Sequence, residues 1–146
     1  MYKWLFVLLP ILGGVAGGLQ APINGALGKR IGVFEAAAVS FTVGAAVGWL
    51  VKWVVGRGDM GRLAGAPLWQ LVGGALGLVF VTSLIIAVPR TGAAVAIFAA
   101  LLGQLAFVLL ADHFGWLGLT KIPFGPGRAV GLVLMLAGVL LVYRSR

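Results

Sequence analysis

The sequence has no cysteine, one histidine and only three acidic residues among its 146 positions. Without cysteine, the chain can form neither a disulfide framework nor a thiolate metal site. A single histidine, His113, excludes a multi-histidine metal site within one chain, so neither a metal nor a cofactor is expected. No nucleophile–base pair and no nucleotide-binding P-loop occur. An enzyme is therefore not expected, no catalytic residue is assigned, and ATP-driven transport by this chain alone is excluded.

Charge is scarce as well: 10% of the residues are charged and 62% are hydrophobic. Soluble domains are about a quarter charged and about half apolar, so lipid must be the solvent for most of this chain. The length allows one membrane domain, residues 1–146, and no separate soluble domain. The net charge of +8 comes from Lys and Arg between apolar segments. Such cations anchor a protein to anionic lipid headgroups, and no nucleic-acid partner is expected.

The apolar residues form five runs, each close to the roughly 20 residues that a membrane-spanning helix needs. We expect an all-α integral membrane protein whose first run is a retained helix rather than a signal peptide. The predicted spans are residues 4–28, 34–55, 68–88, 92–111 and 126–144. Because five is odd, the two termini are predicted to lie on opposite sides of the membrane.

Glycine pairs four residues apart recur along these runs. Such pairs let membrane helices approach closely, because lipid removes the hydrophobic drive for association and leaves packing to hold the helices together. Their recurrence predicts a tightly packed body of several helices. The pairs are Gly13/Gly17, Gly14/Gly18, Gly44/Gly48, Gly73/Gly77 and Gly127/Gly131.

The basic residues are divided almost evenly between the two sides of the membrane. With five spans, one side holds six of them: Lys3, Lys52, Arg57, Arg62, Lys121 and Arg128. The other side holds five: Lys29, Arg30, Arg90, Arg144 and Arg146. An excess of Lys and Arg on one side normally sets orientation. The near balance predicts that the chain inserts both ways up and pairs as an antiparallel homodimer. The alternative is one orientation, set by the longer first loop and by cellular factors.

Polar residues within the first span are its most unusual feature. Gln20 and Asn24 are four apart and share one helix face, and Pro22 leaves the Gly18 carbonyl without its helical donor. An unpaired amide costs roughly 2–7 kcal/mol in apolar surroundings. The two amides must therefore face the protein interior. They either hold helices together or line a polar site at a broken helix, where transporters bind their substrates.

Few other polar groups lie within the predicted spans. Ser40 in the second span and Gln104 in the fourth join Gln20 and Asn24 as predicted substrate-binding residues, lining one water-accessible cavity. Glu35 begins the second span, and Asp112 and His113 end the fourth. These three are candidates for proton or ion coupling, because histidine titrates near neutral pH. Helix capping by Glu35 and helix termination by Asp112–His113 are the alternatives.

Several motifs are similar to the YdcZ-like branch of the drug/metabolite transporter superfamily, over nearly the whole chain. They are LQAPINGALGKRIG from Leu19, AAVSFTVG from Ala37, PRTGAA from Pro89, GQL from Gly103 and DHFGWLG from Asp112. The resemblance implies half of a drug/metabolite-transporter-like fold, five helices per chain, and relatives that pair or are fused. It implies a transporter of the bacterial-type plasma (inner) membrane. The related small multidrug exporters carry a buried glutamate in the first helix, where this chain has Gln20 and Asn24.

The leading interpretation is a secondary transporter of a small polar molecule, with alternating access at a dimer interface. Its partner is a second copy or a sister five-helix chain. The alternative is a structural or auxiliary membrane subunit without transport of its own. Finding Gln20, Asn24 and Gln104 apart, each bonded only to a neighbouring helix, would favour that alternative. With no acid at mid-span, the expected substrate is neutral or zwitterionic, or a cation held at the span edge by Glu35 or Asp112.

Overall fold

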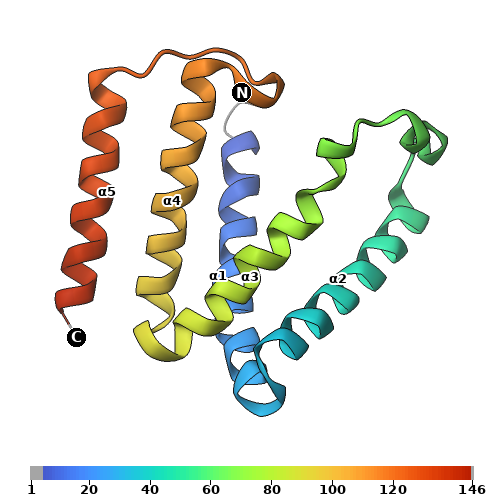
Figure 1. Ribbon diagram of the computed structural model, residues 1–146, viewed down its shortest axis with the longest axis horizontal. Helices are drawn as coiled ribbons and strands as arrows, with labels where there is room; N and C mark the ends of the chain where they lie inside the picture. Colours follow the sequence, from blue (N-terminus) through green and yellow to red (C-terminus); the bar gives the residue numbers. More distant parts are fainter. Residues whose placement is uncertain (1–4, 146) are drawn as a thin grey trace. The chain divides into compact units, whose positions relative to one another are not determined.

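The computed structural model describes residues 5–145, and within that range it contains helices, turns and loops but no strand (Figure 1). The five long helices are α1 (Leu5–Ile31), α2 (Val33–Val55), α3 (Gly73–Thr91), α4 (Ala93–Phe114) and α5 (Pro126–Arg144). Three short 3-10 helices are η2 (Met60–Gly65), η3 (Leu68–Leu71) and η4 (Trp116–Gly118). The expected start of the first span, and the charges Lys3 and Arg146, lie outside the described residues.

All five long helices are apolar and long enough to cross a membrane, the third with η3 as its entry turn. The prediction of an all-α membrane protein with five spans is therefore confirmed. α1 continues past Gly28 to Ile31 and passes through Pro10 and Pro22 without interruption. The broken helix expected around Pro22 is thus wrong: the proline removes one donor, and the remaining turns keep the helix intact.

Two single glycines make the sharp corners between helices. Gly32, between α1 and α2, has φ 105° and ψ 155°, and Gly92, between α3 and α4, has φ 72° and ψ 157°. These backbone conformations are rarely adopted by residues with a Cβ atom. Each glycine carbonyl also accepts the first hydrogen bond of the following helix, from Ala36 and Ala96 respectively. Each glycine therefore separates two helices by a single residue and leaves little backbone outside a helix.

Basic side chains lie in the last turn of all five long helices. Such placement complements the partial negative charge at a helix C-terminus. Glu35, in the first turn of α2, complements the partial positive charge at the N-terminus of that helix. The last-turn residues are Lys29 and Arg30, Lys52, Arg90, His113 and Arg144. Five of the eleven Lys and Arg residues thus lie in the last turns of spans, near headgroups and water.

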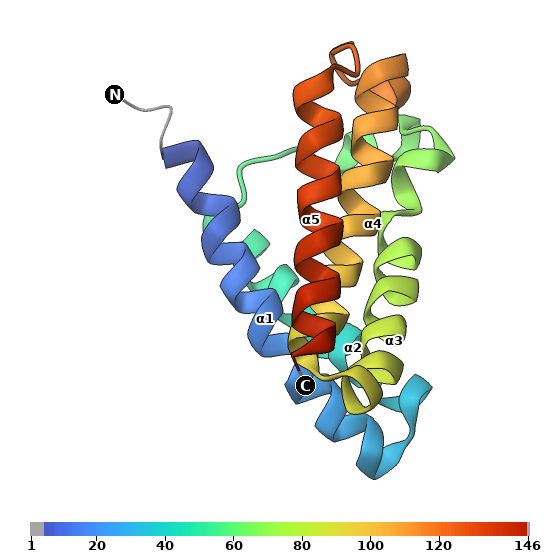
Figure 2. The same ribbon diagram turned by 90° about the vertical axis from the view of Figure 1, so that its left-hand side faces the viewer.

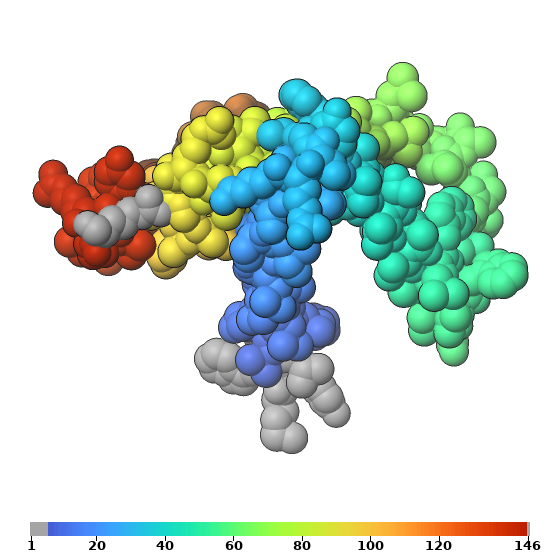
Figure 3. All heavy atoms as spheres, turned by 90° about the horizontal axis from the view of Figure 1, so that it is seen from below, coloured from blue at the N-terminus to red at the C-terminus, as the bar shows by residue number. Residues whose placement is uncertain are grey.

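The chain divides into two compact units, residues 1–89 and 90–146. In the first, a small core forms where the end of α1, the beginning of α2 and the second half of α3 meet. Its buried members are Ala36, Ala37, Val81 and Ile85, with Leu27, Val33 and Phe41 packed against them. From the corner that joins them, α1 and α2 run in diverging directions (Figures 1 and 3).

Within each of the two units, the glycine pairs do not pack helices together, contrary to the tightly packed body expected from their spacing. A Cβ atom built at Gly13, Gly17, Gly44 or Gly48 would meet nothing within 4 Å. The same holds at Gly14, Gly18, Gly73, Gly127 and Gly131. Only Gly77 faces a neighbour, the Phe41 ring at 3.2 Å. The close approaches are instead at glycines outside the predicted pairs, above all Gly28.

The second unit is a hairpin of two long helices. α4 and α5 lie side by side and antiparallel (Figures 1 and 2). η4 and an extended segment connect them, and Gly115 ends α4 in the left-handed conformation, with φ 70° and ψ 33°. Its N–H donates to the Ala111 carbonyl, which closes the last turn of α4.

We predict that Gly28→Ala destabilises the chain by about 1–3 kcal/mol, because overpacking a contact strains its neighbours. A Cβ at position 28 would lie 2.5 Å from Cγ2 of Ile85, a β-branched side chain with little freedom to move. The measurement is reversible unfolding in dilute detergent. The matched control is Gly17→Ala in the same helix, which meets nothing within 4 Å and should be neutral or stabilising. Equal effects at the two positions would contradict the packing of α1 on α3.

Candidate functional site

Among the described residues, Asn24 is the one polar residue whose side chain is buried, with 6% of its surface exposed. Its Nδ2 donates a hydrogen bond to Oγ of Ser40 on α2, at 3.1 Å. Two of the predicted site residues are therefore in direct contact. Asn24 shares a buried face of α1 with Ala21 and Gly25, at helical spacing. This face packs on α2 and α3, so the amide lies in a helix–helix contact.

Gln20 and Gln104 are in a different situation from Asn24. Both side chains are exposed, and neither makes a side-chain hydrogen bond within residues 5–145. The hydroxyls in the spans bond instead to their own helices: Thr42 to the Ala38 carbonyl at 2.9 Å, and Ser83 to the Phe80 carbonyl at 2.7 Å. The two glutamines are thus amides without a side-chain partner within the unit that each belongs to.

Both glutamines lie close to the middle of their helices. Gln104 is the twelfth of the 22 residues of α4, and Gln20 is the sixteenth of the 27 residues of α1. A helix of 22 residues is about 33 Å long at 1.5 Å per residue, close to the roughly 30 Å of a hydrocarbon core. A span centred on the hydrocarbon core would place Gln104 near the bilayer midplane, where an unpaired amide is most costly.

The surroundings of Gln104 are apolar. It lines a shallow groove of about 370 Å³ together with Leu101, Leu105 and Val108 of α4 and Met135 of α5. The amide is the one polar side chain among these lining residues. Gln104 belongs to the second unit and Asn24 to the first. The cavity expected to be shared by Gln20, Asn24 and Gln104 stays a prediction.

The three carboxylates of the sequence have different partners. Asp59 forms an exposed ion pair with Arg62 at 3.5 Å, and Asp112 forms a half-buried ion pair with Arg128 at 3.1 Å. Glu35 makes no ion pair with the described residues. Its carboxylate lies over Gly32, where a Cβ would collide with it. Glu35 is therefore the carboxylate of residues 5–145 without an ion-pair partner.

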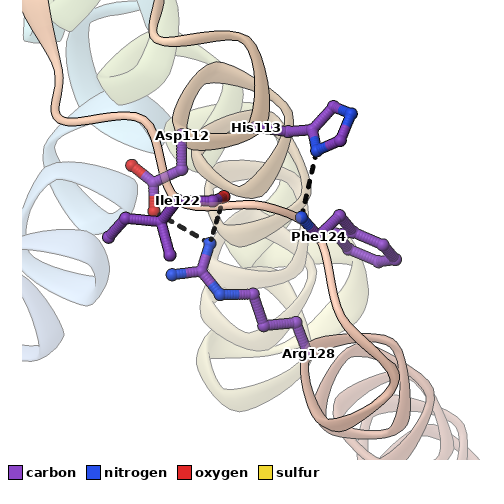
Figure 4. A network of polar contacts seen from close by, with 5 residues as sticks. All are labelled: Asp112, His113, Ile122, Phe124 and Arg128. Atoms are coloured by element: carbon purple, nitrogen blue, oxygen red, sulfur yellow. Dashed lines mark hydrogen bonds and ion pairs between the residues drawn. The ribbon is translucent and has the colours of Figure 1, made fainter.

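Asp112 and His113 end α4, and their side chains bind different partners (Figure 4). Asp112 Oδ2 accepts from the guanidinium of Arg128, the third residue of α5. His113 Nδ1 accepts from the backbone N–H of Phe124 at 3.0 Å. Figure 4 shows the imidazole directed away from the Asp112 carboxylate, and no contact joins the two groups. The proton relay expected between them stays a prediction.

Arg128 and the backbone of Phe124 are the members of this site that the sequence did not reveal. Arg128 entered only the charge tally, because nothing in the sequence links it to a residue 16 positions earlier. The signal that could have found it is the scarcity of acids. Asp112 has only Arg128 and Lys121 as basic residues on the connection that follows it. No cluster of three metal-ligating side chains occurs among the described residues.

Comparison with known protein families gives one match. The model of a family described as "Putative inner membrane exporter, YdcZ" covers residues 5–141. It thus includes all five long helices, apart from the last residues of α5. No curated protein and no solved structure matches the chain.

We predict that Asn24→Ala lowers the free energy of unfolding by about 0.6–2 kcal/mol, the usual range for a polar contact between membrane helices. Ser40→Ala should cost less, because the Asn24 amide can still reach backbone groups. Unfolding of the two single variants and the double variant in detergent measures the coupling. Thr42→Val is the control, since its hydroxyl bonds only to its own helix. Strict additivity of the two single effects would contradict the Asn24–Ser40 bond.

Proposed function

The chain belongs to the YdcZ family of inner membrane exporters, and on this basis we propose that it is a secondary transporter that moves a small polar molecule by alternating access at a dimer interface. It is a multi-pass protein of the inner membrane, with five apolar helices. The family is one of transporters rather than enzymes. The dimer, the site and the substrate class proposed below go beyond what the family description states.

The observation that carries the proposal is the pair of unbonded amides at mid-helix, Gln20 and Gln104. Neither has a side-chain partner in the described chain, and both are exposed at a depth where lipid offers none. Such groups persist in a membrane only where protein or trapped water satisfies them. A second chain that encloses a hydrated cavity supplies both. Substrates of secondary transporters likewise bind near the bilayer midplane, between two repeats.

In an antiparallel pair, residues at the middle of the membrane lie at the same depth in both chains. A two-fold axis in the membrane plane moves every residue to the opposite depth, except those at the midplane. Gln104 of one chain and Gln104 of its partner therefore lie at the same depth. Gln20 lies only about 3 Å along the helix axis from the middle of α1. Four amides then surround one level of the membrane. The even distribution of Lys and Arg supports insertion both ways up.

The charge distribution favours a neutral or zwitterionic substrate. Asp112 is neutralised by Arg128, and Asp59 is exposed and paired with Arg62. Mid-helix positions offer amides, which both donate and accept hydrogen bonds but carry no charge. A bare cation held there would lack a counter-charge. If the substrate is cationic, Glu35 at the span edge is the carboxylate left to receive it.

The structural-subunit alternative has one specific observation in its favour. Asn24 bonds to Ser40 of a neighbouring helix and is buried, as expected for an amide that holds helices together. Gln20 and Gln104 do not share this arrangement. The two hypotheses make different predictions for these glutamines. In a structural subunit their amides would contact only protein, whereas in a transporter they would contact water and substrate.

We predict that Gln104→Leu leaves the fold intact and weakens substrate binding at least about tenfold, because it removes the amide hydrogen bonds. A thermal-shift screen of neutral and zwitterionic metabolites on the wild-type dimer supplies the ligand, and transport is followed in proteoliposomes. The control is Thr42→Val, whose hydroxyl is satisfied within its own helix and which should bind and transport normally.

The absence of cysteine allows a second readout of the same site. Gln104→Cys should react with a small water-soluble thiol reagent at least about tenfold faster than Leu134→Cys, because thiolates react in water. Leu134 is 66% exposed and is also near mid-helix, in α5. Equal, slow labelling of both, with unchanged binding in Gln104→Leu, would favour the structural subunit.

We predict that adding three lysines after Arg146 biases insertion and abolishes function, since all chains then share one orientation. Co-expression with a variant biased the other way, by three lysines after Met1, should restore function. Reporter tags at the C-terminus verify the orientation of each variant. A biased chain that assembles and transports alone would contradict the antiparallel pair but leave the transporter proposal standing.

A further inference from the structure

The segment from Gly115 to Gly125 folds back over the end of α4. Three hydrogen bonds hold this segment and the start of α5 there, and Figure 4 draws two of them, those of Phe124 and Arg128. The backbone N–H of Ile122 donates to the Asp112 carbonyl at 2.8 Å. The backbone N–H of Phe124 donates to His113 Nδ1 at 3.0 Å. Arg128 donates to the Asp112 carboxylate at 3.1 Å. Only one of these contacts has an imidazole nitrogen as its acceptor.

The hydrogen bond at His113 specifies the protonation state of the ring. A nitrogen that accepts from an N–H cannot carry a proton itself, so the proton of neutral His113 is on Nε2. Imidazolium has no acceptor nitrogen at all. Protonation of His113 therefore removes the acceptor for Phe124 and leaves two N–H groups facing each other. The contact exists only while the ring is neutral.

The backbone of this segment is poorly suited to hold its conformation unaided. Leu117 has φ 57° and ψ 22°, in the left-handed region that a residue with a branched side chain rarely adopts. Gly115 and Gly118 on either side also have positive φ. A segment that includes a disfavoured conformation depends on its fastening contacts. The loss of one of them changes its population more than it would in a relaxed loop.

We propose that His113 is a proton-binding site that controls the α4–α5 connection: the neutral ring fastens Phe124 to the end of α4, and the protonated ring releases it. The released part is local. The Ile122 contact uses only backbone atoms and remains. In the structure, the His113 ring is in edge contact with Phe114, at 4.8 Å between centroids, and Phe114 stacks on Trp116 at 5.2 Å.

The charged groups around His113 do not provide a replacement for the lost contact. Asp112 on α4 already accepts from Arg128 of α5, and Figure 4 shows both on the side away from the imidazole. Lys121 in the connecting segment packs near Gly115 and is cationic, so it cannot accept a hydrogen bond. η4 contributes no charged residue. Imidazolium therefore turns to water or headgroups.

The use of this site in transport rests on the proposed function. α4 carries Gln104, and its end carries His113, so protonation at one membrane face changes the fastening of the helix that holds the mid-depth amide. A transporter with such a contact senses the pH on the side where the α4–α5 connection lies. In an antiparallel dimer, the two copies of His113 lie on opposite sides and sense the two compartments separately.

The experiment is amide hydrogen exchange on the full-length protein in lipid nanodiscs, at about pH 5.5 and pH 8, with no substrate. Rates are expressed as protection factors, which removes the intrinsic pH dependence of exchange. We expect the protection of Phe124 to fall roughly 2- to 10-fold at the lower pH, the change expected for loss of one neutral hydrogen bond. Ile122 is the internal control and should keep its protection, because its acceptor is a backbone carbonyl.

The matched variant is His113→Asn, whose Oδ1 can accept from Phe124 at both pH values but does not titrate. Its Phe124 amide should stay protected throughout, whereas His113→Ala should lose protection at both pH values. Imidazole ¹⁵N shifts at pH 8 give a variant-free check, since they should show the proton on Nε2. A wild-type Phe124 amide with unchanged protection, or His113→Asn with the wild-type drop, overturns the proposal.

Failure of this proposal is distinguishable from failure of the proposed function. The exchange experiment needs neither substrate nor transport, so a chain that transports nothing can still show the pH-dependent contact. Conversely, wild-type transport with the same pH profile as His113→Asn would separate His113 from transport while leaving the transporter assignment intact.

Discussion

Hydrocarbon offers no hydrogen-bond partner, so every polar group within a membrane-spanning helix needs one from protein or from trapped water. The chain meets this requirement at three levels. Thr42 and Ser83 bond to carbonyls of their own helices. Asn24 bonds to Ser40 on the adjacent helix. Gln20 and Gln104 have no side-chain partner in the described chain, and the proposed dimer with its hydrated cavity is where we expect their partners.

Few residues are needed to end the long helices and to connect them. Gly32 and Gly92 turn the chain within single residues, and basic side chains occupy every last turn of the long helices. The longer connections are where charged pairs form, as between Asp112 and Arg128. In contrast, the faces of α1 and α2 that carry the paired glycines meet no neighbour within the first unit. Their spacing suits a close helix–helix contact, and the proposed second chain is what could supply it.

Much of the fold followed from patterns that lipid imposes on a sequence. Apolar runs of the right length predicted five membrane helices, because a helix is the one local structure that satisfies its own backbone in hydrocarbon. The prediction for Pro22 was wrong for a physical reason: a single lost donor is small beside the remaining bonds of a 27-residue helix. The glycine pairs misled as well, since spacing shows that a contact is allowed but not which helix makes it.

The sequence by itself determined that lipid surrounds most of the chain and that five helices span it. It also determined which polar residues lie within the apolar runs. It identified Gln20, Asn24 and Gln104 equally, because each is an amide in an apolar run. Only the tertiary structure separated them, by burying Asn24 against Ser40 and leaving the other two exposed. It also decided the partners of Asp112 and His113, which depend on a fold-back that brings Phe124 and Arg128 to the end of α4. Burial and pairing across a loop are properties of the packed chain, and one-dimensional spacing does not contain them.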